Sequence, residues 1–143
     1  MYFDDFKLGL TVDIAPVVIE KEKMLDFART YDNMPLHTDE EYAKSTPFGK
    51  LIAPGVMTFM SVWAKYLEVD FLGNELIAGK STKIEWLKPV YAYDVLTGKA
   101  TVTKLVKRSI KNGLVEITIE IYNQDGELVI VNITEAVVKC RSV

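Results

Sequence analysis

Residues 55–67, with the sequence GVMTFMSVWAKYL, are apolar on almost every face of the helix that their spacing predicts. A helix of this kind is stable when other elements surround it, because a helix on the surface of a domain needs a polar face toward water. Pro54 comes directly before it and suits the first helical position, where its missing N–H is not needed. The rest of the chain must therefore enclose this helix.

After this helix in the sequence, the spacing of the apolar residues changes from a helical to an alternating period. In residues 115–121, Val and Ile at odd positions alternate with Glu and Thr at even positions, which predicts a half-buried strand. Asn112-Gly113 and residues 124–126 predict turns on either side of it. Strand patterns occur in four consecutive segments: 77–86, 97–103, 115–121 and 129–138. This succession favours an antiparallel meander, so we expect an α+β fold in which the sheet wraps around the long apolar helix.

The first part of the chain mixes strand and helix patterns. Residues 11–20 are rich in β-branched side chains and predict a strand, although Pro16 argues against a central place in a sheet. Residues 21–30 have apolar side chains at helical spacing. A capping-box pattern that starts at Thr38 predicts a short helix over residues 39–44.

The composition fits one soluble domain over residues 1–143. Hydrophobic residues make up 49% of the chain, which is enough for a core, and the net charge of −3 argues against a nucleic-acid partner or an anionic membrane surface. The single cysteine, Cys140, excludes an internal disulfide and a thiolate metal cluster, and no other group of metal ligands is evident. With neither a signal-peptide pattern nor an apolar membrane span, we expect a cytoplasmic protein.

The strongest candidates for chemistry are Asp32 and His37, the only histidine of the chain. They lie five residues apart in the sequence YDNMPLH, which interrupts two helical patterns. A carboxylate and an imidazole can divide the work of general base and general acid near neutral pH. Spacing alone, however, favours a surface pair, or helix caps formed by Asp32 and Thr38.

A second candidate is the Pro54-Gly55 pair at the start of the apolar helix. The first N–H groups of a helix lack acceptors within the helix, and the helix dipole adds positive potential there. The Gly55 N–H could therefore stabilise a developing oxyanion, and glycine would let a ligand approach closely. Alternatively, the pair only shapes the turn into the helix.

Residues 28–57 resemble the signature of the MaoC-like family, the R-specific enoyl-CoA hydratases. The family motif Gly-Asp-x-Asn-Pro-x-His, with later Ala, Phe and Gly positions, is matched at Asp32, Pro35, His37, Ala43, Phe48 and Gly55. Similar motifs flank this region: FDDFKLG at residues 3–9 and LKPVYAYDVL at residues 87–96. The resemblance thus extends over nearly the whole chain.

The resemblance implies a hot-dog fold, a homodimer or higher homo-oligomer, and a substrate that is an acyl-CoA or acyl-carrier-protein thioester. Asp32 would activate water for attack on Cβ of a trans-2-enoyl thioester, His37 would protonate Cα, and Gly55 N–H would bind the thioester oxygen. No cofactor is implied, because the thioester is itself the electron sink. Alternatives are a hot-dog acyl-CoA thioesterase and a non-catalytic acyl-CoA-binding protein.

The chain departs from the family pattern near the expected site. Met34 replaces the asparagine of the motif, and Tyr31 replaces its glycine. Trp63 stands near a serine that many hydratases carry in the central helix, for which Ser61 is only a loose substitute. We expect Met34, Met60 and Trp63, together with Pro54, to contribute to substrate binding, with Met60 and Trp63 reshaping the acyl channel.

Overall fold

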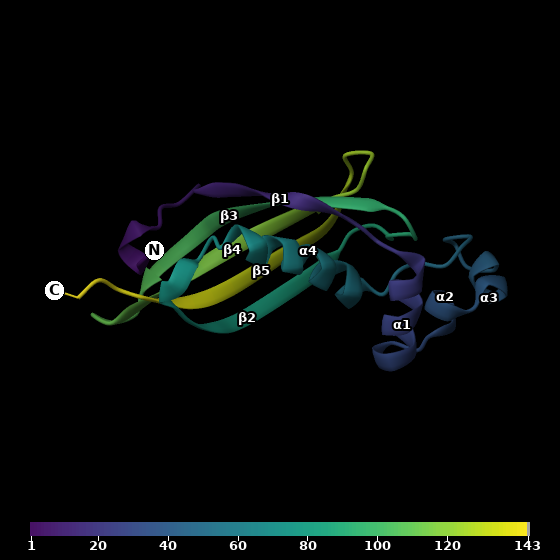
Figure 1. Ribbon diagram of the computed structural model, residues 1–143, viewed down its shortest axis with the longest axis horizontal. Coiled ribbons are helices and arrows are strands. Elements are labelled where there is room, and N and C mark those ends of the chain that lie inside the picture. The colour runs from purple at the N-terminus through teal and green to yellow at the C-terminus, as the bar shows by residue number, and fades with distance from the viewer. Residues whose placement is uncertain (143) are drawn as a thin grey trace.

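The computed structural model describes residues 1–142, and its strands form a single antiparallel sheet that curves around a long helix (Figure 1). The long helix is α4 (Gly55–Val69). The strands are β1 (Thr11–Val18), β2 (Leu76–Trp86), β3 (Val95–Lys107), β4 (Asn112–Tyr122) and β5 (Leu128–Lys139). This arrangement confirms the α+β, hot-dog fold expected from the sequence.

The strand order is β1-β3-β4-β5-β2, which corrects the expected meander of four strands. β3, β4 and β5 do follow one another as neighbours, but β2 pairs with β5, with Thr82 opposite Thr134. Residues 87–94 then connect β2 to β3 on the other side of the sheet. Alternating hydrophobicity fixes which face of a strand is buried but not which strand lies beside it, so the sequence pattern could not give this pairing.

β1 pairs only with β3 and therefore lies at an edge of the sheet, as Pro16 led us to expect. The pairing register shifts between Ile14 and Val17, around the proline. Proline has no N–H to donate to a neighbouring strand, so an edge position with an irregular register accommodates it.

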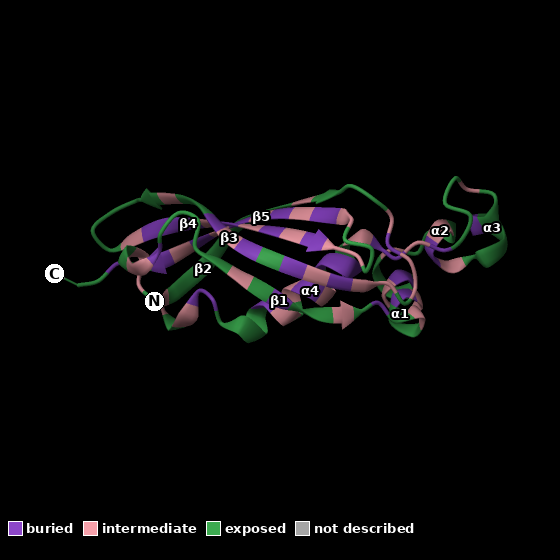
Figure 2. Cartoon of the chain, turned by 90° about the horizontal axis from the view of Figure 1, so that it is seen from above, coloured by how far each residue is buried: buried purple, intermediate pink, exposed green. Residues whose placement is uncertain are grey.

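The core lies between α4 and the concave face of the sheet. Phe59, Val62 and Tyr66 of α4 are buried there and belong to one apolar cluster with side chains of β3, β4 and β5. Buried residues alternate with less buried ones along these strands (Figure 2). Val56, Met60 and Leu67 on another face of α4 remain exposed, and so does most of β2. The sheet therefore encloses only part of the helix surface.

Three short helices lie at the end of the molecule away from both termini (Figure 1): α1 (Lys21–Tyr31), α2 (Pro35–Thr38) and α3 (Glu40–Lys44). The cap of α3 is Asp39, whose carboxylate accepts the Tyr42 N–H at 3.1 Å, and not Thr38 as expected. Thr38 instead ends α2 and donates its hydroxyl to the Met34 carbonyl. None of the helices in residues 1–142 has the length and apolarity needed to cross a membrane.

The two predicted turns had different outcomes. Residues 124–126 form the turn between β4 and β5, and Gly126 has the positive φ of 75° that a turn glycine allows. Asn112 and Gly113, by contrast, begin β4, and residues 108–111 make the preceding turn. The absence of a side chain at Gly113 serves packing, since a Cβ there would lie 2.4 Å from the ring of Phe3.

Candidate active site

Asp32 and His37 come together because α1 ends just before Asp32 and α2, which contains His37, begins a few residues later. Asp32 caps the C-terminus of α1, where its N–H donates to the Ala28 carbonyl at 2.9 Å. Met34 and Pro35 then start α2, and one turn of helix carries His37 back toward Asp32. The Nε2 atom of His37 lies 3.2 Å from Oδ2 of Asp32. The sequence interruption thus brings the pair into direct contact.

The hydrogen bonds of His37 determine which nitrogen is available for chemistry. Nδ1 lies 2.7 Å from the Ile52 carbonyl oxygen, which can only accept, so Nδ1 carries a hydrogen and donates it. Nε2 is the nitrogen that faces Asp32. Because a carboxylate also only accepts when ionised, the contact is satisfied when a proton lies between Nε2 and Oδ2. His37 is therefore oriented for proton transfer through Nε2.

The pair differs in exposure, which suits a division of roles. His37 is buried, with 5% of its surface exposed, whereas about a third of the Asp32 side chain, 35%, is exposed. The carboxylate can thus meet water and ligands while the imidazole is held rigidly from behind by the Ile52 carbonyl.

The pair opens into a pocket of about 410 Å³, which we call the catalytic pocket. Its walls come from α1 and α2, the start of α4, the end of β2 and the two connections that follow α3 and β2. The lining residues are Asp32, His37, Phe48, Ile52, Ala53, Gly55, Val56, Thr58, Trp86, Leu87, Lys88, Pro89 and Val90. Most of them are apolar, and the polar side chains are Asp32, His37, Thr58 and Lys88. Pockets of this size and character suit small organic ligands.

Gly55 lies at this pocket as the first residue of α4. Its N–H has no acceptor within the helix, as for any residue of a first helical turn. Trp86 packs directly over it, so that a Cβ at residue 55 would lie 2.4 Å from two atoms of the indole ring. The pocket therefore combines a carboxylate, an imidazole and a helix N-terminus, the three groups that general acid–base chemistry beside a developing oxyanion requires.

Comparison with known proteins identifies the family. The model of the MaoC like domain matches residues 5–124. The chain belongs to this family.

Curated relatives and solved structures are consistent with the assignment of this MaoC-like protein to the family. It is 30% identical to the uncharacterized protein YdeM of Bacillus subtilis over 136 residues, covering 90% of this chain and 96% of that protein. It is 31% identical to the (R)-specific enoyl-CoA hydratase of Rhodospirillum rubrum, covering 73% of this chain and 72% of that enzyme. A solved structure described as a monoamine oxidase regulatory protein from Archaeoglobus fulgius superposes with a TM-score of 0.93 at 31% identity, covering 99% of this chain and 96% of that one.

Thr58 lines this MaoC-like pocket and was not among the residues expected there from the sequence. Its side chain is buried, lines the catalytic pocket and donates its hydroxyl to the Gly55 carbonyl at 2.7 Å. The signal was present, because residues three apart on a helix share a face, so Thr58 must follow Gly55 toward the pocket. Ser61, the loose substitute for a helix hydroxyl, donates to the Met57 carbonyl and does not line the pocket.

Four of the expected substrate-binding residues lie outside the lining of this pocket. Pro54 is the N-cap of α4 rather than its first residue, and Met34 is the half-exposed N-cap of α2. Met60 is 48% exposed, and the Trp63 ring packs between Phe59 and Tyr66. The expectation that Met60 and Trp63 line the acyl channel is not met in this pocket, because they lie roughly 7 and 12 Å beyond Gly55 along the axis of α4.

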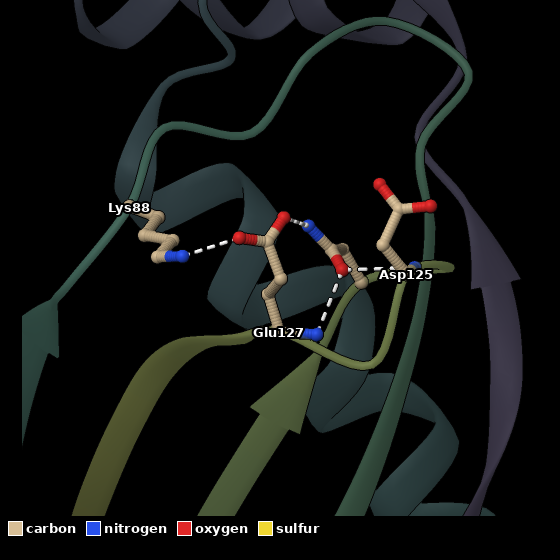
Figure 3. Close-up of polar contacts among 4 residues, drawn as sticks. Lys88, Asp125 and Glu127 are labelled. Atoms are coloured by element: carbon tan, nitrogen blue, oxygen red, sulfur yellow. Dashed lines mark hydrogen bonds and ion pairs between the residues drawn. The ribbon is translucent and has the colours of Figure 1, made fainter.

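Trp86, Leu87 and Lys88 were also missed as pocket residues, since their distance from Asp32 in the sequence hides their proximity. Lys88 stands at the rim, where its ammonium pairs with the Glu127 carboxylate from the β4–β5 turn (Figure 3). The Asn123 side-chain amide also donates to Glu127, at 3.1 Å. This pairing, chiefly the Lys88 contact, lowers the pKa of Glu127 below its ordinary value. The contact fixes one wall of the pocket to the end of the sheet.

Proposed function

We propose that this protein is an enoyl-thioester hydratase, which adds water across a trans-2-enoyl thioester to give an (R)-3-hydroxyacyl thioester, or catalyses the reverse dehydration. The observation that carries the proposal is the contact of Asp32 with Nε2 of His37 inside a mainly apolar pocket that also contains Gly55. The similarity to the (R)-specific enoyl-CoA hydratase of Rhodospirillum rubrum supports the same reaction and its stereochemistry.

The reaction follows from the proposed position of the substrate between these groups. Asp32 takes a proton from water as the water oxygen bonds to Cβ of the alkene. The electron pair of the double bond moves onto the thioester carbonyl, and the Gly55 N–H stabilises the resulting enolate oxygen. Nε2 of His37 then gives a proton to Cα.

The direct contact within the pair completes the cycle. The proton taken up by Asp32 returns to Nε2 of His37 across the 3.2 Å between them, so both residues regain their starting state. The proposed reaction needs no metal or cofactor, because the thioester carbonyl receives the electrons. Apolar walls favour it, since excluding bulk water strengthens each polar interaction with the reacting atoms.

We also propose that two copies of the chain assemble into a homodimer. β2 pairs on one side only, with β5, and most of its residues are exposed. The apolar side chains of Val56, Met60 and Leu67 on α4 are exposed as well. A free strand edge and an exposed apolar helix face are both surfaces that a second chain would stabilise.

The function is tested by adding the protein to crotonyl-CoA and following loss of the conjugated enoyl-thioester absorbance. We expect Asp32→Asn and His37→Ala each to lower kcat/KM by a factor on the order of 100 or more. Asp26→Asn is the matched control, because it makes the same chemical change on an exposed residue of α1. Full activity of either pair variant would refute the assigned roles. Release of free thiol without hydration would instead indicate a thioesterase, and binding without turnover a non-catalytic acyl-CoA-binding protein.

A further inference from the structure

A second pocket, of about 320 Å³, lies beside the catalytic pocket and is not used by the proposed reaction. We call it the lysine–tyrosine pocket. Its lining residues are Lys21, Glu40, Lys44, Gly49, Lys50, Leu51, Tyr91, Ala92 and Tyr93. The segment that follows α3 and the connection from β2 to β3 form its walls, and the same two segments contribute walls to the catalytic pocket.

The charge of this pocket opposes that of the whole protein. Three lysines and one glutamate line it, although the chain has a net charge of −3. Lys21 pairs with Glu40, and Lys44 pairs with Glu41. Lys50 has no carboxylate within ion-pair distance among residues 1–142, and its ammonium lies 4.3 Å from the centre of the Tyr91 ring. A local excess of positive charge attracts anionic ligands even in an acidic protein.

Tyr93 adds an exposed aromatic ring held in an unusual backbone conformation. Its φ is 67°, in the left-handed region that is strained for a bulky residue, and 65% of its surface is exposed. Two hydrogen bonds fix this conformation, from Tyr93 N–H to the Ile19 carbonyl at 2.6 Å and from Asp94 N–H to the Tyr91 carbonyl at 3.1 Å. Glycine would adopt the same turn without strain. The turn therefore does not explain the tyrosine side chain, whereas strain kept at a ligand site is a recurrent feature of proteins.

A hollow of about 280 Å³ joins the two pockets. It shares Lys88 and Pro89 with the catalytic pocket and Lys50 and Tyr91 with the lysine–tyrosine pocket. Three carboxylates, those of Asp94, Asp125 and Glu127, offset its two lysines, and Glu127 already neutralises Lys88 (Figure 3). The hollow thus suits an uncharged polar chain better than a phosphate.

The three cavities form a sequence of chemical environments: an apolar pocket with the Asp32–His37 pair, a polar hollow without excess positive charge, and a basic pocket with aromatic rings. A coenzyme A thioester has the same order of parts, namely an acyl thioester, a neutral arm of amides and a phosphorylated adenosine. We propose that the lysine–tyrosine pocket binds the phosphorylated adenosine end of a coenzyme A thioester whose acyl end occupies the catalytic pocket. Lys50 and Lys44 contact the phosphates, and the adenine packs against Tyr93.

This inference rests on the proposed function and deepens it, because it selects coenzyme A over an acyl-carrier protein, which has no adenosine. It can nevertheless be tested without turnover. The probe is adenosine 3′,5′-bisphosphate, whose binding is measured by calorimetry. We expect Lys50→Glu to weaken binding about tenfold or more, as loss of a charge-assisted contact does. Lys99→Glu is the matched control, since Lys99 is an exposed lysine of β3 outside all three cavities.

Tyr93→Gly separates a binding role from a structural one. The variant relieves the left-handed strain, so we expect unchanged or higher thermal stability together with weaker binding of the bisphosphate. Lower stability with unchanged binding would mean that Tyr93 only supports the turn, and would overturn its assignment to the site.

Displacement distinguishes a coenzyme A site from a separate nucleotide site. In the Asp32→Asn variant, which we expect to bind substrate with little turnover, crotonyl-CoA should displace the bisphosphate. The N-acetylcysteamine thioester of crotonate, which has no nucleotide, should not. Absence of bisphosphate binding, binding that Lys50→Glu leaves unchanged, or simultaneous binding of crotonyl-CoA and bisphosphate would each overturn the inference. Failure of the proposed function alone would appear differently, as bisphosphate binding and displacement without hydration by the unaltered protein.

Discussion

The indole ring of Trp86 packs over Gly55 so closely that a Cβ on residue 55 would lie 2.4 Å from two of its ring atoms. The contact joins the end of β2 to the first turn of α4, two elements that are otherwise far apart in the sequence. Both residues line the catalytic pocket. The need for glycine at position 55 is thus a packing requirement.

Gly55→Ala should therefore disturb both stability and activity. The added methyl group must displace the indole, and overpacking of this kind lowers the free energy of unfolding by about 1–3 kcal/mol. We expect a matching shift in urea denaturation and slower turnover of crotonyl-CoA. Gly79→Ala is the control, because nothing lies within 4 Å of a Cβ at that position.

The cause can be checked with a second substitution. If the indole is the obstacle, Trp86→Ala in the Gly55→Ala background should restore part of the lost stability, beyond what the two single changes predict by addition. Simple additivity would show that the clash is not responsible.

Thr58 should matter through its hydroxyl rather than its size. Thr58→Val keeps the shape but removes the hydrogen bond to the Gly55 carbonyl, which should lower the free energy of unfolding by about 1 kcal/mol. We expect slower turnover as well, since this bond helps to fix the first turn of α4 beside the pocket. Thr58→Ser should retain most of the activity.

Ser61→Ala provides the comparison on the same helix. Ser61 makes the same type of bond, to the Met57 carbonyl, but does not line the pocket. Equal kinetic effects of Ser61→Ala and Thr58→Val would indicate a general loss of helix stability.

The sequence predicted the helices and strands of this fold better than it predicted which strands pair with each other. Local periodicity identified the apolar helix and each strand, because side-chain spacing within an element depends only on the backbone period. The pairing of β2 with β5 depends on contacts between residues about fifty positions apart, such as Thr82 and Thr134. The Asn112-Gly113 turn was wrong for a related reason: the distant Phe3 ring requires the glycine.

At the site, too, residues close in the sequence could be predicted, whereas residues brought there from distant segments could not. Asp32 and His37 are close in the sequence, so their motif spacing was informative, and Thr58 could have been found from its helical relation to Gly55. Trp86 and Lys88 come from β2 and the connection after it, and only the fold reveals that they border the pocket. Met60 and Trp63 were expected at the pocket from the resemblance of the central helix to the family pattern, which does not determine how far along α4 the pocket extends.

Met60→Glu should weaken the proposed homodimer. Met60 is exposed on α4 between Val56 and Leu67, so a carboxylate there would have to be buried without a partner when a second chain covers this face. We expect sedimentation velocity to show a shift from dimer toward monomer at micromolar concentration. Ile110→Glu makes the same kind of change at an exposed turn before β4 and should leave the assembly unchanged. Dimers of undiminished stability in the Met60 variant would exclude this face of α4 from the interface.

Tyr66 tests the cost of a buried hydroxyl in the core. Its side chain packs beside Trp63 and Phe71, and its hydroxyl has no hydrogen-bond partner among residues 1–142. Tyr66→Phe removes this unsatisfied group and should raise the free energy of unfolding by about 1 kcal/mol at neutral pH. Tyr31→Phe, at an exposed position, should have no effect.

Burial also raises the pKa of Tyr66 to about 12. The unfolded chain therefore loses this proton near pH 10, before the folded protein does, so stability that is fully present below pH 10 should decline as the pH rises toward 12. Tyr66→Phe should reduce this alkaline loss in denaturation curves measured at successive pH values, and an alkaline loss equal to that of the unaltered protein would contradict the assignment.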